Sequence, residues 1–515
     1  MYGCREKIRR VSFWRPDLRL VAVLSILTLI LLLIPLIRLT AYAVPWYDGY
    51  NFGRYVKNFL DEEYSLRSAL RGAAVCVKSE WYAWQGAYTA TFFSALMPAV
   101  WGEEYYFLGP LFIILILPVS VCVLMKTLMR DVLKADMASC VIVQSVAAAI
   151  AVVLIHSPQE GFYWYVGGSC YVGVHSFLML LTAAWIKLLT GRRKTSAALL
   201  FIGALAGAAL VAGSTYVTAL QGILIGLSIV ALGVLLRNKR VLLLLPSLAV
   251  YAYGFYKSAS APGNQVRKAI LAETGMGMDA VSAIAASFVE AFRHMGEFTD
   301  GLMLVMMIFL LPVIWNIVRK TNVRFRYPGI LLLWSFCLYA AGFTPCLYSL
   351  GYAGPERALN VTKLTYQMLL LVNEGYWLGW LYGKLRQTGE AALFGWQWEK
   401  KRESSASGKN MPVVFYAVIV LLTLGLGVIE PDKEGSFSSY CAYHYVHTGE
   451  AYNFHQEYLK RVEAIKNGGD VVVVEPYHFK PWIIFMGELS EDADSGPNSA
   501  IANFYDKRAV MLRKQ

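Results

Sequence analysis

The sequence predicts an all-helical protein that crosses a membrane many times, and three observations carry that prediction. Of its 515 residues, 57% are hydrophobic and only 16% are charged, whereas soluble proteins carry about 25% charged residues. The mean hydropathy is positive, at +0.47. Apolar runs recur along the chain, and they are long enough for the helix of about 20 residues that a bilayer core requires.

Basic residues between the apolar runs predict which side of the membrane each loop occupies. The net charge is +12, but the lysines and arginines cluster in short runs beside the apolar segments. Such runs mark cytoplasmic loops, so we expect membrane lipids and no nucleic acid among the partners. The runs lie at 9–10, 192–194, 237–240, 319–326 and 400–402.

Placing these runs inside the cell predicts eleven spans in the cell membrane, within a transmembrane domain over 18–429. Residues 1–17 then form a cytoplasmic N-terminus, and the C-terminus is extracytoplasmic. The first span is long enough to cross the bilayer and no small-residue cleavage site follows it, which favours a signal anchor over a cleaved signal peptide. The predicted spans are 18–40, 106–126, 138–156, 172–190, 197–213, 216–236, 240–256, 299–318, 328–346, 361–382 and 412–429.

Two long outer loops are predicted to lie on the membrane surface. The first, 41–105, is rich in tryptophan and tyrosine, whose rings prefer the headgroup level. The second, 257–298, repeats apolar residues at three- and four-residue spacing from Val281 to Phe292, opposite polar residues such as Ser287. That period predicts an amphipathic interfacial helix.

Two further segments differ from the apolar body of the chain. The stretch 383–411 is serine-rich beside a basic cluster, which is typical of a flexible cytoplasmic linker. The tail, 430–515, is polar and contains a strand candidate at 470–475. We expect the tail to form a small extracytoplasmic α/β or α+β domain.

Neither the cysteines nor the histidines predict a metal or a cofactor. The eight cysteines include no C-x-x-C pair, so a redox motif is not indicated. In the tail, Cys441, His444 and His447 are suitable zinc ligands by type, but steps of three residues drift around a helix. We therefore predict no metal site and no cofactor.

Asp48 is the candidate catalytic residue. It follows the first span directly, among Trp46, Tyr47 and Tyr50. Partial desolvation at a membrane surface raises the pKa of a carboxyl group, and a raised pKa suits a general base. The alternative is a solvated aspartate in a turn, which the adjacent glycine also favours.

Glu104 is the second carboxylate of interest, because it closes the same outer loop just before the next span. Its neighbour Glu103 points elsewhere on most backbones, so one of the two at most serves the site of Asp48. We expect Glu104 to contact an acceptor or sugar. An acidic cap at a helix N-terminus is the alternative.

Two arginines in outer loops are candidate phosphate ligands. Arg267 ends the stretch 261–267, and Arg357 ends the stretch 354–357; each follows a proline just beyond a span. The planar fork of arginine binds phosphate through two nitrogens. The alternative is that both cations touch ordinary lipid headgroups.

Three further residues, all near aromatic clusters, are candidate sugar contacts. Glu160 and Trp164 share one short loop, and Trp84 lies in the first outer loop. Sugar rings stack their C–H faces on aromatic rings and donate hydroxyl groups to carboxylates. An ordinary aromatic belt at the membrane surface has the same composition.

Four strings together resemble a bacterial family of polytopic membrane proteins of unassigned activity, which is related to the GT-C glycosyltransferases. They are the Asp-x-Tyr turn at Asp48, the Trp-x-x-Trp-x-Gly segment at 81–86, the Glu-Gly-x-Tyr-Trp loop at 160–164, and Ala-Pro-Gly-Asn-x-x-Arg at 261–267. The resemblance covers about 40–380, and the last string, which contains Asn264, is the most specific.

The resemblance implies a GT-C-like bundle and an inverting glycosyltransferase that uses a polyprenyl-phosphate sugar donor at the outer face. An acidic residue of the first outer loop would be the base, which is Asp48 here, and Asn264 joins the sugar contacts. A single aspartate replaces the Asp-x-Asp pair of common GT-C patterns, which favours a metal-independent reaction. The acceptor would be a glycan or lipid of the cell envelope.

Two other functions stay open on the sequence. One is a transporter or flippase for a lipid-linked saccharide, and the other is an inactive assembly subunit. Transporters carry ionisable residues at mid-membrane, whereas most of the predicted spans have none there. Polar and aromatic residues instead crowd the outer loops, which favours chemistry at one face.

Overall fold

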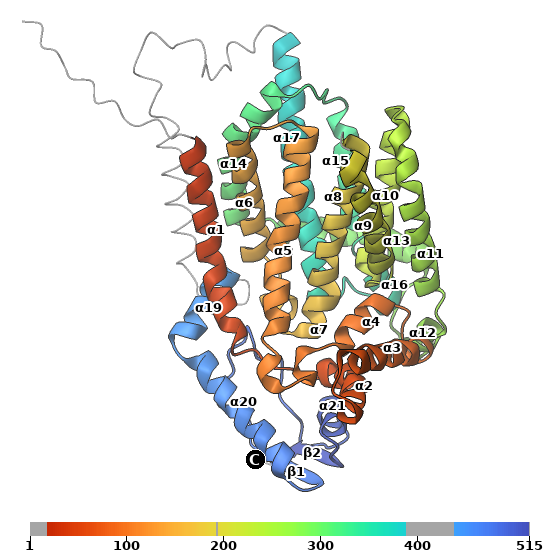
Figure 1. Ribbon diagram of the computed structural model, residues 1–515, viewed down its shortest axis with the longest axis vertical. Helices are drawn as coiled ribbons and strands as arrows, with labels where there is room; N and C mark the ends of the chain where they lie inside the picture. Colours follow the sequence, from red (N-terminus) through yellow and green to blue (C-terminus); the bar gives the residue numbers. More distant parts are fainter. Residues whose placement is uncertain (1–17, 192–193, 388–436, 514–515) are drawn as a thin grey trace, which may run out of the picture.

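The computed structural model describes residues 18–191, 194–387 and 437–513, and nearly all of its regular structure is helical. In Figure 1 the long helices stand side by side as a bundle, and shorter helices gather at its lower end. The predicted all-helical class is confirmed. The bundle helices are α1 (Leu18–Thr40), α5 (Leu108–Lys126), α6 (Met137–Val153), α8 (Val174–Thr190), α9 (Lys194–Ala212), α10 (Tyr216–Leu235), α11 (Leu245–Ala259), α14 (Gly301–Lys320), α15 (Pro328–Ala340) and α17 (Glu356–Gln387).

Six helical stretches in the described residues are long and apolar enough to cross a membrane. Large apolar side chains on them face outward; Leu31 is 66% exposed and Leu333 is 64% exposed. Water penalises such a surface and a lipid tail does not, so the chain has the make-up of a multi-pass membrane protein. The stretches are Leu18–Thr40, Glu103–Val132, Tyr165–Thr190, Tyr216–Leu235, Gly301–Lys320 and Pro328–Leu350.

The structure has shorter apolar helices at some of the other predicted spans. Met137–Val153 and Ala197–Ala212 are apolar helices that are shorter than the other six. The helices on either side of Ser214 are separate, as the two basic runs flanking them predict. The eleventh predicted span, 412–429, lies outside the described residues, as do residues 1–17 and most of the linker 383–411.

The first of the predicted outer loops, 41–105, folds into three helices that lie across the lower end of the bundle (Figure 1). They are α2 (Asp48–Glu62), α3 (Leu66–Ala83) and α4 (Tyr88–Ala95), and two short turns follow, η1 (Pro98–Val100) and η2 (Glu103–Tyr105). Ser65 starts α3 by accepting a hydrogen bond from the backbone N–H of Ser68, as an N-cap does.

The second of the predicted outer loops, 257–298, forms α12 (Pro262–Glu273) and α13 (Ala280–Phe298). The predicted amphipathic helix is present, because α13 covers the whole periodic stretch. Its apolar side faces outward, with Val281 77% exposed and Phe292 67% exposed, whereas Ser287 is buried. Ala283 and Ala291 are buried on the same side as Ser287, so small residues line the inner face of α13 and large apolar side chains stand on its exposed face. α16 (Thr344–Leu350) packs against α13.

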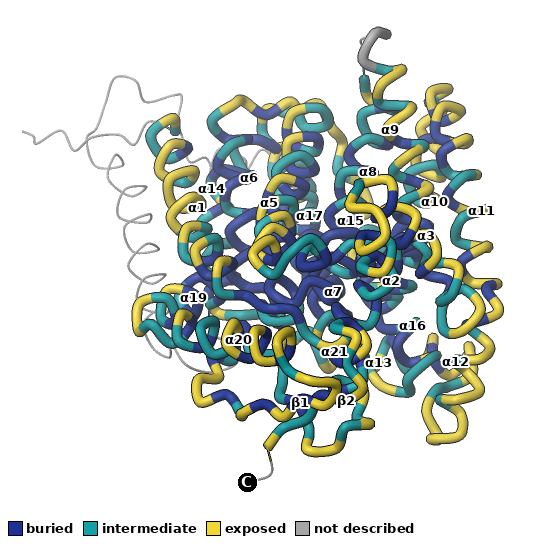
Figure 2. The backbone as a smooth tube through the Cα atoms, turned by 60° about the horizontal axis from the view of Figure 1, so that its bottom comes forward, coloured by how far each residue is buried: buried dark blue, intermediate teal, exposed yellow. Residues whose placement is uncertain are grey.

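A chain of short turns lies at the buried centre of the molecule. It consists of η4 (Gln159–Tyr163), α7 (Tyr165–Gly167) and η5 (Gly168–Gly173), and both η elements are π-helical. All three residues of α7 are buried, and Figure 2 shows α7 amid dark blue, buried backbone. π-Helical turns occur frequently at functional sites.

The C-terminal segment packs on the lower end of the bundle. It forms α19 (Ser438–His447), α20 (Glu450–Asn467), β1 (Val471–Val474), α21 (Gly496–Phe504) and β2 (Ala509–Leu512). β1 and β2 pair in parallel, with Val471 opposite Ala509, so the predicted strand at 470–475 is present. The hydrophobic core runs without a break from the bundle into this segment.

Candidate active site

Asp48 is the first residue of α2, and the start of that helix is held firmly. The backbone N–H of Gly49 donates to the Trp46 carbonyl over 2.8 Å. A Cβ atom at Gly49 would lie 2.7 Å from the sulfur of Met97, so glycine lets α2 approach the chain after α4 closely. The turn before α2 therefore fixes where Asp48 begins the helix.

The electrostatic surroundings of Asp48 raise the pKa of its carboxyl group. Burial is the largest cause, and the negative charge of Glu160 adds to it, while the positive charge of Arg357 acts in the opposite direction. The direction agrees with the prediction from the sequence. Asp48 lies within electrostatic reach of both residues, although they are far away in the chain.

Glu160 and Arg357 form an ion pair. One carboxylate oxygen of Glu160, Oε2, accepts from Arg357 Nη1 over 3.2 Å and from the Arg357 backbone N–H over 3.0 Å. The Arg357 guanidinium lies 5.1 Å from the centroid of the Trp164 ring, a cation–π distance. Burial alone would lower the pKa of Arg357, but Tyr171, Glu160 and Asp48 hold that pKa above its ordinary value.

The backbone around this ion pair is locked by Asn360. Its Oδ1 accepts from the Ser157 N–H over 2.7 Å, and its Nδ2 donates to the Ser157 carbonyl over 2.9 Å. A Cβ atom at Gly161 would lie 2.8 Å from Asn360 Nδ2. The start of α17 and the loop that carries Glu160 are therefore one rigid unit.

A second unit joins the strings 81–86 and 261–267. The Gly86 N–H donates to Asn264 Oδ1 over 3.1 Å, across 178 residues of sequence. A Cβ atom at Gly263 would lie 2.6 Å from the Trp84 backbone nitrogen. The Arg267 guanidinium lies 5.3 Å from the centroid of the Trp84 ring. Each unit thus presents an arginine against a tryptophan.

Arg267 differs from Arg357 in having no acidic partner. Within the described ranges, no carboxylate lies at ion-pair distance from Arg267, and its buried Nε atom has no hydrogen-bond acceptor. An uncompensated cation that is partly buried is costly. It is therefore suited to bind an anion that arrives from outside the chain.

Charge–charge interactions connect the two units through η5. Arg267 and Arg357 both act on Tyr171 and on Cys346. Asp48 and Arg357 both act on Cys170, which neighbours Tyr171 in η5. The two cations and the candidate base therefore share one region around the buried turns.

Two of the predicted sugar contacts, Glu104 and Asn264, have surroundings that differ from those of the other three. Glu104 is exposed, whereas its neighbour Glu103 accepts hydrogen bonds from Tyr458 and Tyr505 of the C-terminal segment. Asn264 uses its whole amide within the protein, because Oδ1 also accepts from Tyr216 and Nδ2 donates to the carbonyls of residues 258 and 259. We assign Asn264 a positioning role.

The structure adds one carboxylate that the sequence prediction missed. Glu80 has a raised pKa because of burial, opposed by Arg54 and reinforced by Asp48, so it lies in the electrostatic field of the candidate base. The sequence carries only a weak signal for it, since Glu80 precedes Trp84 by four residues, and Trp84 lies just beyond the end of α3.

The described part of the chain contains no group of three histidine, cysteine or acidic side chains that could hold a metal ion. No protein-family model matches the chain, and neither a curated protein nor a solved structure resembles it significantly. The function is therefore inferred from the geometry of the site and from the resemblance of its strings.

Proposed function

We propose that the protein is an inverting membrane glycosyltransferase that moves a sugar from a polyprenyl-phosphate donor to a cell-envelope glycan or lipid. The observation that carries the proposal is the meeting of the predicted strings. Asp48, the Glu160–Arg357 ion pair and the Trp84–Arg267 pair come from five segments of the chain, and their charges interact around η5.

Asp48 supplies the base in this reaction. The acceptor hydroxyl has a pKa far above neutrality, so its attack needs a base within hydrogen-bond reach. The acceptor oxygen forms a bond to the anomeric carbon as its proton passes to Asp48. The bond from that carbon to the phosphate oxygen breaks, and polyprenyl phosphate leaves with the electron pair.

The two arginines stabilise the leaving phosphate. Arg267 brings a positive charge that no carboxylate in the described residues neutralises. Arg357 brings a second positive charge, and Glu160 holds its guanidinium in place by accepting a hydrogen bond from Nη1. Cations placed where negative charge develops lower the barrier without a general acid. Trp164 and Trp84 fix the direction of each guanidinium.

The proposal includes an arrangement in the membrane. The lower end of the bundle in Figure 1 is the outer side, the eleven predicted spans cross the membrane, and the C-terminal segment is extracytoplasmic. The basic runs at 192–194 and 237–240 support it, because they lie between bundle helices whose other ends carry the candidate site.

One observation favours transport of a lipid-linked saccharide as the second candidate function. Both carboxylate oxygens of Glu374, inside α17, are buried without a hydrogen-bond partner among the described residues. Lys363 of the same helix is 6% exposed and pairs with Asp300 over 2.9 Å. Ionisable residues inside membrane helices mark transport pathways, and the sequence prediction had counted the scarcity of such residues against this function.

The Asp48→Asn variant tests the proposed function. It keeps the shape of the side chain and removes the base, so turnover should fall by roughly 10²-fold while binding of polyprenyl phosphate stays nearly unchanged. Purified protein in lipid nanodiscs provides both measurements.

The matched control is Glu62→Gln, which removes an exposed carboxylate from the same loop and should leave turnover unchanged. Full transfer activity in Asp48→Asn would contradict the role of the base. If no form of the protein transfers a sugar, and Glu374→Gln abolishes transport of the lipid-linked saccharide, the second function is favoured.

A further inference from the structure

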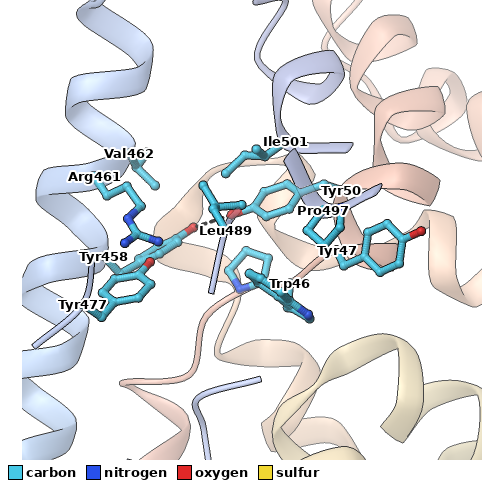
Figure 3. Close-up of a pocket in the computed structure, with 11 residues that line it drawn as sticks. Trp46, Tyr47, Tyr50, Tyr458, Arg461, Val462, Tyr477, Leu489, Pro497 and Ile501 are labelled. Carbon is cyan, nitrogen blue, oxygen red and sulfur yellow. Dashed lines mark hydrogen bonds between the residues drawn. The ribbon is translucent and has the colours of Figure 1, made fainter. Parts of the chain in front are cut away.

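Glu374 is a buried carboxyl group inside α17, within the predicted span 361–382. Neither of its side-chain oxygens accepts a hydrogen bond, and no cation in the described residues lies at ion-pair distance. The buried tyrosines in Figure 3 are different, because the hydroxyl groups of Tyr50 and Tyr458 lie 3.2 Å apart and pair with each other. An ionised carboxylate without a partner in a membrane is far more costly than a neutral one, so such a group takes up a proton.

The elements packed against α17 bring no charge that compensates Glu374. α6, α10 and α15 contain no lysine, arginine, aspartate or glutamate. Their other titratable groups are cysteines and tyrosines, which are neutral at neutral pH. The charged groups on or beside the remaining packed elements are Glu160 of η4, Asp300 ahead of α14, Arg319 and Lys320 at the end of α14, and Arg326 ahead of α15.

Glu374 belongs to a polar stripe on one face of α17. An α-helix has about 3.6 residues per turn, so residues seven or eleven positions apart lie on the same face. The stripe consists of Glu356, Lys363, Gln367 and Glu374. Gln367 donates from Nε2 to the carbonyl at the end of α6 over 3.1 Å, whereas its buried Oε1 has no partner among the described residues. That oxygen is free to accept a hydrogen bond from water.

The polar stripe opens at one end of α17. Glu356, its first member, is exposed and pairs with His156 over 2.8 Å. Lys363 and Gln367 are buried. Beyond Glu374 the same face continues with Leu378 and Leu381. Polar groups therefore lead from the start of α17, at the proposed outer side, as far as Glu374.

We propose that Glu374 is a proton-binding site inside the membrane, and that its proton exchanges with the outer side along the polar stripe. Metal ions require several ligands, and the described residues contain no group of three that could hold one. Seven residues of helix span about 10 Å, so water molecules complete the path between members of the stripe. The inference stands apart from the proposed glycosyl transfer, which uses no residue of α17 beyond its first turn.

Infrared spectroscopy of the full-length protein tests both parts of the proposal. The protein is held in a detergent without ester groups, because lipid esters absorb in the same region as carboxylic acids. At neutral pH the wild type should show the C=O band of a protonated carboxyl group, which shifts when H₂O is replaced by D₂O. Glu374→Gln keeps the shape of the side chain and should lose this band.

The rate of the shift in D₂O measures access to the site. Gln367→Met removes the polar group from the stripe and keeps an unbranched side chain, so the shift should become severalfold slower. Asn373→Leu is the matched control, because Asn373 is a buried amide of the same helix that donates to Ser335 over 2.8 Å instead. Its exchange rate should equal that of the wild type.

A hydrophobic carbodiimide provides a second measurement on the unaltered protein, because it attacks protonated carboxyl groups inside a membrane. Mass spectrometry should find its adduct at Glu374, whereas a water-soluble carbodiimide should modify the exposed Glu62 and spare Glu374.

The outcomes separate the site, its path and the proposed base. A spectrum without a band that Glu374→Gln removes, or no adduct at Glu374, would overturn the proton site. Equal exchange rates in Gln367→Met and Asn373→Leu would overturn the path to the outer side. Asp48→Asn should keep the Glu374 band, so the proton site and the proposed base fail independently of each other.

Discussion

At the scale of single residues, Asp48 shows what a sequence can and cannot say about a site. Its place after a span, among aromatic residues, predicted a desolvated carboxyl with a raised pKa, and the structure gives that direction. The charges that modify the pKa, Glu160 and Arg357, lie more than a hundred residues away. Their proximity depends on tertiary packing, which residue spacing does not encode.

The pH dependence of activity should reveal the effect of Glu160 on the pKa of Asp48. The base acts when it is deprotonated, so activity rises with pH through the raised pKa of Asp48. Glu160 raises that pKa, so Glu160→Gln should lower it and shift the acid limb of the kcat/KM profile to lower pH.

Steady-state kinetics over a pH series measures that limb. Glu62→Gln is the matched control, because Glu62 is an exposed carboxylate outside the ion pair, and its profile should coincide with that of the wild type. An acid limb that stays in place or shifts upward in Glu160→Gln would show that Glu160 does not act on the base.

At the scale of elements, the sequence predicted helices well and their junctions poorly. The apolar runs and the basic residues between them indicate helix positions, because each signal is local to the helix. Nothing in the local sequence predicts the contact between 81–86 and 261–267. It joins the end of α3 to the start of α12, which are far apart in the chain. The glycines in both strings are evident in the sequence. The structure gives their reason, because they let two stretches of backbone approach each other closely.

Gly86→Ala should break that junction. A Cβ atom there would lie 2.0 Å from the Ser258 carbonyl oxygen, so backbone must move. Overpacking of this kind destabilises the folded protein by about 1–3 kcal/mol, so the thermal unfolding temperature should fall. Because Arg267 belongs to the same unit, polyprenyl-phosphate binding at Arg267 should also be lost.

Gly203→Ala is the matched control within a helix. A Cβ atom at Gly203 meets nothing within 4 Å, and alanine favours the helix by about 1 kcal/mol over glycine. Its unfolding temperature should therefore stay level or rise, as followed by differential scanning fluorimetry in detergent. Equal stability of the two variants would contradict the tight junction at Gly86.

At the scale of the whole molecule, the site and the C-terminal segment occupy one end of the bundle (Figure 1). The sequence predicted a tail that forms its own small domain, and the structure shows a tail that shares the hydrophobic core with the first outer loop. Tyr50 contacts Phe504, with ring centroids 5.1 Å apart. Such pairing follows from complementary shape, which composition does not reveal.

Membrane topology should place this end outside the cell. A reporter fused after Gln515 should read as extracytoplasmic, because the basic runs at 192–194 and 237–240 predict a cytoplasmic location for the opposite end of the bundle. A reporter inserted at 192 serves as the control and should read as cytoplasmic. A cytoplasmic reading at Gln515 would reverse the proposed arrangement in the membrane.

The proposed donor-phosphate site at Asp48, Arg267 and Arg357 is the central proposal, and a cryo-electron microscopy structure with bound polyprenyl phosphate tests it directly. We expect the phosphate density within hydrogen-bond distance of both guanidinium groups and beside Asp48. The density should vanish in Arg267→Gln and persist in Lys268→Gln, which removes an adjacent exposed cation that contacts Tyr348. Phosphate bound at another part of the molecule, or retained in Arg267→Gln with unchanged occupancy, would contradict the proposed site.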